Sequence, residues 1–283
     1  MFKRSLIGGL VAATALLTMA DTASAIRWGE PDNGEHPYVG IMVALDDAGQ
    51  PMFRCSGTLV DADTFLTAGH CTYGVDRAEI WFYEDMSAAG AYGYPFVGQA
   101  SGEAIAHPEY DDNAFFLYDV GVVEIDTVRS GQPITLTADP NDTYAPMPSP
   151  ASITTDLGYF DRVIAEPGRP TLFDTVGYGL QRNSPVADRV EAVRVRLKAT
   201  VRLRNDDRVF GGRGDGNYVV FSNNANTGGT CNGDSGGPVF IEGTSTVVAV
   251  TSFGVNSNCA GSGGAYRIDQ PDDQDFLDDF IGG

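Results

Sequence analysis

The chain has 283 residues, 42% of them hydrophobic and 20% charged, which is enough for one or two domains with a sizeable core. Its 38 acidic residues against 18 basic ones give a formal net charge of −20, which argues against a nucleic-acid-binding surface. The 35 glycines and the short apolar runs favour β structure over a helix bundle.

The N-terminus has the form of a secretory signal peptide. A basic pair precedes the apolar run Leu6–Ala20, and Ala23-Ser24-Ala25 supplies small residues for cleavage. An anchoring helix needs about 20 apolar residues, and this run is shorter. We therefore predict a signal peptide over residues 1–25, a mature protein that begins at Ile26, secretion, and no membrane contact after cleavage.

Short strands separated by turn residues recur along the rest of the chain. The predicted strands include Tyr38–Leu45, Gly57–Thr67, Val120–Ile125, Val239–Ile241 and Val247–Phe253. The clearest is Val193–Arg204, where apolar residues alternate with Arg, Lys and Thr as in a half-buried strand with one wet face. That basic face either binds an anion or balances nearby carboxylates in solvent, and we favour the second interpretation.

The sequence also indicates a connection between two halves and a helix at the C-terminus. The stretch Asp139–Asp156 is rich in Pro, Asp and Ser, which is typical of a linking segment. Pro271-Asp272-Asp273 has the composition of a helix start. One face of the short helix would then carry Phe276, Leu277, Phe280 and Ile281, and would dock on the body of the protein.

Four cysteines form an even set, as expected for disulfides in an exported protein: Cys55, Cys71, Cys231 and Cys259. They contain no Cys-x-x-Cys motif and no His-rich cluster accompanies them, so a zinc site is not expected. The residue pattern alone leaves three pairings open.

Three short strings contain the residue types of nucleophilic catalysis. They are Leu66-Thr67-Ala68-Gly69-His70-Cys71, Tyr118-Asp119-Val120-Gly121 and Cys231-Asn232-Gly233-Asp234-Ser235-Gly236-Gly237-Pro238. A serine hydroxyl becomes a good nucleophile when a neighbouring base takes its proton, and His has a pKa suited to that task. The second imidazole N–H then needs an acceptor, which a carboxylate provides.

These strings resemble the trypsin/chymotrypsin family of serine endopeptidases, and His, Asp and Ser follow one another in that family's order. The resemblance covers about residues 26–283. It implies an all-β fold of two six-stranded antiparallel barrels, over residues 26–145 and 146–269, with the active site between them. A short C-terminal helix over residues 270–283 would follow.

The resemblance also implies roles for single residues. Ser235 would be the nucleophile, His70 the general base, and Asp119 the carboxylate that orients the imidazole. The backbone N–H groups of Gly233 and Ser235 would form an oxyanion hole, in which each donor contributes about 2.7–4 kcal/mol. Ser252 would hydrogen-bond Asp119.

The same resemblance pairs Cys55 with Cys71 and Cys231 with Cys259. It implies no cofactor and no metal. Glu84 and Asp85 fall near a calcium position of some relatives, but two carboxylates are too few for a site.

For the substrate, Ser252-Phe253-Gly254 resembles the family's Ser-Trp-Gly strand, which pairs with the substrate backbone. Phe in place of Trp is a departure. Gly229 corresponds to the base of the primary pocket, and Gly254 and Gly264 to its walls. Since no acidic residue stands at the base, we expect large apolar or aromatic P1 side chains. An elastase-like preference is the alternative if loops refill the pocket.

The resemblance further implies activation by signal cleavage. Ile26-Arg27-Trp28-Gly29 resembles the family's Ile-Val-Gly-Gly start, whose new ammonium would pair with Asp234. The expected partners are peptide or protein substrates, and we expect a monomer. A non-catalytic binding protein on the same scaffold is the alternative, for instance through Arg213-Gly214-Asp215, although that tripeptide is more often a turn.

Overall fold

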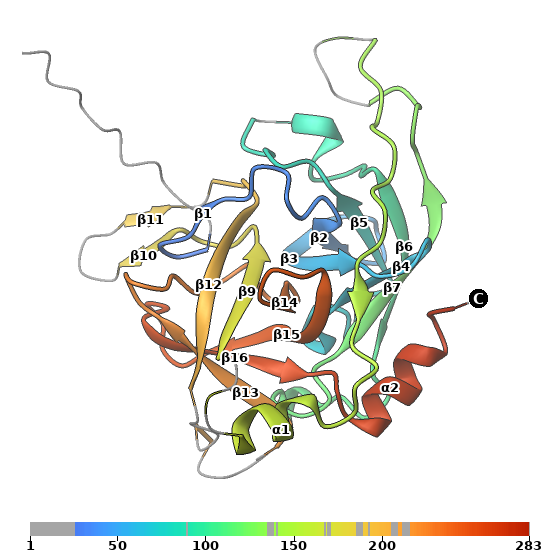
Figure 1. The fold of residues 1–283 in the computed structure, drawn as a ribbon. Coiled ribbons are helices and arrows are strands. Elements are labelled where there is room, and N and C mark those ends of the chain that lie inside the picture. Colours follow the sequence, from blue (N-terminus) through green and yellow to red (C-terminus); the bar gives the residue numbers. More distant parts are fainter. Residues whose placement is uncertain are drawn as a thin grey trace, which may run out of the picture.

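A computed structural model describes residues 26–88, 90–134, 139, 141–166, 168, 171–184, 189–191, 193–204, 209–210 and 216–282. Residues 1–25, the expected signal peptide, and Arg213-Gly214-Asp215 lie outside the described residues. Two six-stranded antiparallel β-barrels dominate the fold (Figure 1), which confirms the fold class that the resemblance implied.

The first barrel closes in the order β2, β3, β4, β7, β6, β5. Its strands are β2 (Val39–Leu45), β3 (Pro51–Leu59), β4 (Thr64–Thr67), β5 (Arg77–Trp81), β6 (Ala100–Ala106) and β7 (Gly121–Val128). The apolar strand β2 is buried along nearly its whole length because it pairs with both β3 and β5. Phe65 and Trp81 fill the centre and are fully buried.

The second barrel closes because β9 pairs with β14 on one side and with β12 on the other. Its strands are β9 (Leu172–Gly177), β12 (Leu197–Arg204), β13 (Tyr218–Asn223), β14 (Pro238–Ile241), β15 (Thr246–Gly254) and β16 (Gly261–Arg267). Two short strands extend this sheet: β1 (Glu30–Pro31) along β12 and β8 (Ser152–Ile153), in parallel, along β15.

Near each end of the described residues, a segment that adjoins one barrel in sequence packs against the other barrel. Strand β1 precedes the first barrel but pairs with the second. The C-terminal helix α2 (Pro271–Asp278) follows the second barrel but packs beside the first (Figure 1), where Phe276 and Leu277 join its core. The Thr64 hydroxyl on β4 donates a hydrogen bond to the carbonyl of Phe280 at 2.6 Å. The expected C-terminal helix is thus confirmed.

Shorter elements complete the described chain. They are the 3-10 turns η1 (Gly69–Cys71), η2 (Ala91–Gly93) and η3 (Asp112–Ala114), the hairpin β10 (Arg182–Ser184) and β11 (Arg189–Glu191), and helix α1 (Tyr159–Ala165). The sequence patterns did not predict α1, whose buried Phe160 and Val163 cover the second barrel. No helix of the described residues is long and apolar enough to span a membrane.

Two strand predictions need correction. The stretch Gly57–Thr67 is a tight hairpin rather than one strand, because the polar turn Asp61-Ala62-Asp63 lets the Val60 N–H reach the carbonyl of Thr64. The alternating stretch becomes a regular strand only at Leu197, and its basic face is not uniformly wet. Arg196 is 2% exposed and is ion-paired with Asp32.

Candidate active site

Two paired strands bring His70 and Asp119 together. His70 lies in η1, just after β4, and Asp119 lies just before β7. Since Thr67 pairs with Gly121 across β4 and β7, the residues that flank these strand ends become neighbours. The backbone N–H of His70 donates to Asp119 Oδ1 at 2.8 Å, and His70 Nδ1 lies 3.0 Å from both carboxylate oxygens.

The second barrel supplies a further hydrogen-bond donor to the Asp119 carboxylate. Ser252, on β15, donates its hydroxyl to Asp119 Oδ2 at 2.5 Å, as expected. Asp119 is fully buried, and these donors replace the water it has lost. Burial lowers the pKa of His70, but the charge of Asp119 and its hydrogen bond outweigh this effect and leave the pKa raised.

Ser235 lies on a loop that hydrogen bonds hold to the first barrel. Ser56, on β3, donates its N–H to the carbonyl of Ser235 at 2.8 Å and its hydroxyl to the carbonyl of Gly233 at 2.9 Å. Gly236 has a φ of +75°, and a Cβ there would lie 1.9 Å from Thr67 Oγ1. A glycine is therefore required for this loop to approach the segment that carries His70. The sequence analysis missed Ser56.

The neighbouring Asp234 is buried and accepts two backbone hydrogen bonds. Gly179 donates to its Oδ1 at 2.7 Å and Cys231 to its Oδ2 at 2.8 Å. Burial raises the pKa of Asp234 to about 7, against the effect of these bonds and of the Arg54 charge.

Ile26, the expected first residue of the mature protein, lies on the second barrel. It is fully buried in that barrel's core, and the following residue, Arg27, forms a β-bridge with Gly229.

Both disulfides form between the expected partners. Cys55 bonds to Cys71, which ties β3 to the turn carrying His70, and Cys231 bonds to Cys259. The cysteines next to His70 are thus oxidised, so their grouping with the imidazole offers no thiolate pair for a metal.

Among the residues expected around the primary pocket, Phe253 pairs with Gly264 across β15 and β16, and Gly254 pairs with Gly263. Gly229 abuts Asn223, because a Cβ on Gly229 would lie 2.4 Å from the Asn223 Cγ. A Cβ on Gly264 would lie 2.1 Å from the ring of Phe253, so that ring fills the space beside Gly264. A Cβ on Gly263 would lie 2.9 Å from Thr230 Oγ1 and 3.9 Å from Asn223 Nδ2.

Asn223, Thr230 and Gly263 were not identified from the sequence. Asn223 lies six residues before Gly229, and no motif marked it.

Comparison with known proteins agrees with this geometry. The family model described as "Trypsin" matches residues 26–271. The chain is 28% identical to brachyurin of Leptuca pugilator over 215 residues, covering 74% of this chain and 79% of that protein. It is also 28% identical to trypsin of Saccharopolyspora erythraea over 238 residues, covering 82% and 87%.

Solved structures share the fold. An HL collagenase aligns over 91% of this chain and all of its own with a TM-score of 0.64 and 16% identity. A mutant of human heparin binding protein aligns over 89% and 94% with a TM-score of 0.55 and 19% identity. Since the family model spans both barrels and all three strings, the chain belongs to the trypsin family of serine endopeptidases.

Proposed function

We propose that this enzyme is a secreted serine endopeptidase that cleaves peptide bonds through Ser235, His70 and Asp119 and an acyl-enzyme intermediate. The observation that carries the proposal is the hydrogen-bond chain from Ser252 through Asp119 to His70 Nδ1, beside the loop that presents Ser235. With Nδ1–H held by the carboxylate, Nε2 is left bare to accept a proton.

In the proposed reaction, His70 takes the proton of the Ser235 hydroxyl as its oxygen attacks the substrate carbonyl. The protonated imidazole is stabilised by Asp119 and returns the proton to the leaving amine. The N–H groups of Gly233 and Ser235 donate to the oxyanion. Gly233 has a φ of +95°, which favours glycine, and Ser56 holds its carbonyl from the other side. In deacylation, His70 takes a proton from a water as that water attacks the acyl carbon, and it returns the proton to Ser235 Oγ as the carboxylic acid product leaves.

For the P1 residue we propose an apolar or aromatic preference, with Gly229, Gly254 and Gly264 around the primary pocket and Ser252 and Phe253 along the substrate backbone. The three heavy atoms nearest to a Cβ on Gly229 all belong to Asn223, whose side-chain amide is neutral. A Lys or Arg side chain would therefore be buried without a counterion. We expect substrates with Phe, Tyr or Leu at P1 to be cleaved much faster than those with Arg or Lys.

Secretion is proposed on the signal-like N-terminus and on the two disulfides, which persist in oxidising compartments. Peptides and proteins are the proposed partners of a monomeric enzyme, without nucleic acid or membrane. We also propose that cleavage after residue 25 frees the Ile26 ammonium to pair with Asp234.

Replacement of the nucleophile tests the proposed chemistry. Ser235→Ala should lower kcat on the order of 10⁶-fold, because the members of such a triad act as a unit. It should also abolish labelling by a fluorophosphonate, while the far-ultraviolet circular dichroism stays unchanged. Ser245→Ala, at an exposed serine on the turn before β15, is the matched control and should keep full activity. More than about a hundredth of the wild-type kcat in Ser235→Ala would contradict the assignment.

A further inference from the structure

A buried polar atom beside Gly229, the expected base of the primary pocket, has no partner among the described residues. Asn223, the last residue of β13, is 1% exposed, and among the described residues its Oδ1 has no hydrogen-bond partner. A buried acceptor left unpaired costs about 1–3 kcal/mol. Such an atom calls for a functional or structural explanation.

The hydrogen bond of the amide nitrogen determines the orientation of the Asn223 side chain. Asn223 Nδ2 donates to the carbonyl of Thr230 at 2.6 Å. Rotating the amide by half a turn would set two oxygens against each other, so the hydrogen bond assigns the nitrogen and the oxygen. The unpaired group is therefore an acceptor and requires a donor.

The amide of Asn223 lies in the space that a side chain at position 229 would fill. A Cβ on Gly229 would be 2.6 Å from Asn223 Oδ1, so glycine at position 229 leaves the space that Asn223 occupies. On its other side Asn223 approaches Gly263, whose Cβ would be 3.9 Å from Nδ2. Gly263 pairs with Gly254 across β15 and β16, so neither member of this pair brings a side chain to the site.

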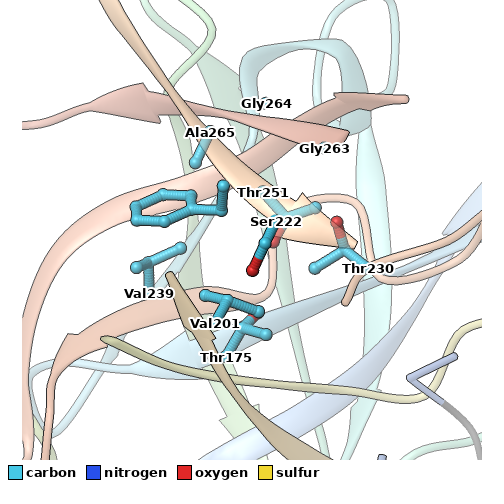
Figure 2. Close-up of a pocket in the computed structure, with 10 residues that line it drawn as sticks. Thr175, Val201, Ser222, Thr230, Val239, Thr251, Gly263, Gly264 and Ala265 are labelled. Carbon is cyan, nitrogen blue, oxygen red and sulfur yellow. The ribbon is translucent and has the colours of Figure 1, made fainter. Parts of the chain in front are cut away.

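A cavity inside the second barrel does not supply the missing donor. This cavity of about 10 Å³ has room for about one water, and Thr175, Ser222, Thr230 and Thr251 point toward it (Figure 2). The hydroxyls of Thr175 and Thr251 are themselves without a partner among the described residues, so a water in this cavity would have hydrogen-bonding groups other than Asn223. Asn223 is not among the residues that line the cavity.

We propose that Asn223 determines P1 specificity, with its Oδ1 accepting a hydrogen bond from the phenolic hydroxyl of a P1 tyrosine. This inference rests on the proposed function and narrows its aromatic preference. Tyrosine combines an apolar ring with a donor at its tip, which matches glycine walls and one neutral acceptor at the base. Phenylalanine would leave Oδ1 unpaired, and a site built to bond a hydroxyl discriminates against the analogue that lacks it.

A substrate series on the wild-type enzyme tests the inference without any substitution. The probes are tetrapeptide p-nitroanilides that differ only at P1 and carry tyrosine, phenylalanine or 4-methylphenylalanine. The 4-methyl group has nearly the size of the hydroxyl but cannot donate. We expect kcat/KM for tyrosine to exceed both others about tenfold, and equal values for tyrosine and 4-methylphenylalanine would overturn the inference.

Fluorophosphonate titration in the same samples distinguishes a failure of the role of Asn223 from a failure of the proposed function. An enzyme that is labelled at Ser235 but cleaves the three substrates alike overturns only the role of Asn223. An enzyme that is neither labelled nor active overturns the proposed function itself.

Substitutions of Asn223 test whether this residue causes the tyrosine preference. Asn223→Leu should reduce the ratio of tyrosine to phenylalanine to about one, by a loss for tyrosine and a gain for phenylalanine. Asn223→Asp should raise cleavage after lysine at least tenfold, because a carboxylate then stands at the base. Asn226→Leu, at an exposed asparagine on the same loop, is the control and should keep the wild-type ratios. A tenfold tyrosine preference that persists in Asn223→Leu would overturn the inference, and the wild-type series stands whether or not the variants fold.

Discussion

The Asp119 carboxylate accepts hydrogen bonds from residues of both barrels. It is held by the first barrel through His70 and by the second through Ser252, and it is fully buried between them. Its charge counteracts the burial of His70 and leaves the pKa of the imidazole raised above its ordinary value. Activity that depends on neutral His70 should therefore appear as the pH rises through this raised pKa.

Replacing the carboxylate by an amide gives a prediction about both rate and pH. Asp119→Asn should lower kcat about 10⁴-fold, because the imidazole is no longer held in the productive tautomer. The acidic limb of kcat/KM should also move to lower pH, since the attracting charge is gone and burial still lowers the pKa of His70. The measurement is a pH profile with an apolar P1 substrate.

Ser252→Ala is the control for that experiment, because it removes one donor and leaves the charge. Its acidic limb should stay near that of the wild type. An unchanged limb in Asp119→Asn would show that Asp119 does not set the protonation of His70.

At the scale of elements, the segment that leads into β12 carries a buried ion pair. Arg196 Nε lies 2.8 Å from Asp32 Oδ2, and its guanidinium donates to the carbonyls of Val39 and Phe82 at 3.1 Å. Asp32 also lies 2.5 Å from His36 Nδ1. This network joins the N-terminal segment, the first barrel and the second barrel at one point.

Removing the cation should destabilise the fold. Arg196→Met leaves the carboxylate of Asp32 buried with less compensation, and we expect a loss of about 3–5 kcal/mol in the free energy of unfolding. Arg202→Met, at an exposed position of β12, should change that free energy by less than about 0.5 kcal/mol. Chemical denaturation measures both, and equal losses would contradict a structural role for the buried pair.

Helix α2 contains a buried carboxyl whose charge is unfavourable in the folded state. Asp273 is fully buried and accepts the hydroxyl of Tyr266 at 3.0 Å. Burial raises the pKa of Asp273 to about 8, although the hydrogen bond from Tyr266 opposes this. Because the folded pKa lies above the unfolded value of about 4, its contribution to stability is fully present below pH 4 and is lost as the pH rises toward 8.

Asp273→Asn should remove that pH dependence. The amide oxygen can still accept the Tyr266 hydroxyl, and it carries no charge to bury. The variant should therefore be more stable than the wild type at pH 8 and differ little at pH 4, as measured by thermal unfolding at both values. Asp275→Asn, at an exposed position of the same helix, is the control and should leave the pH dependence unchanged. A wild type that is as stable at pH 8 as Asp273→Asn would contradict the prediction.

At the scale of the whole molecule, the N-terminal segment lies against the second barrel. Ile26 is fully buried, and Arg27 bridges to Gly229, five residues before Asp234. The Asp234 carboxyl is buried and has a pKa raised to about 7 in the chain that carries residues 1–25. A new ammonium at Ile26 is a fitting counterion for such a carboxylate.

Two forms of the enzyme test this activation. A chain that begins at Ile26 should be active, whereas one that begins at Ala25 should be nearly inactive, as counted by fluorophosphonate titration. If the pair forms, the pKa of the ammonium rises above its ordinary value of about 8. The active form is then favoured below that value and lost as the pH climbs through the raised pKa. Full activity in the form that begins at Ala25 would refute the ion pair.

The sequence by itself determined the family, and the resemblance to that family implied the barrel fold and the disulfide partners. The strings around His70, Asp119 and Ser235 are local, and each combines a reactive residue with the glycines or cysteine that its backbone requires. Short apolar runs between turn residues predicted β2, β7, β14 and β15 to within a few residues, because strands buried on both faces are apolar along most of their length.

Other features were decided only by the tertiary structure, since they depend on contacts between distant segments. Ser56 clamps a loop 177 residues away, and Arg196 is buried by a carboxylate 164 residues away. Alternation predicted a wet Arg196 because it counts only neighbours along the strand. Likewise, the sequence showed only that position 229 carries no side chain. The close approach of β13 then placed the amide of Asn223 where a side chain at position 229 would lie.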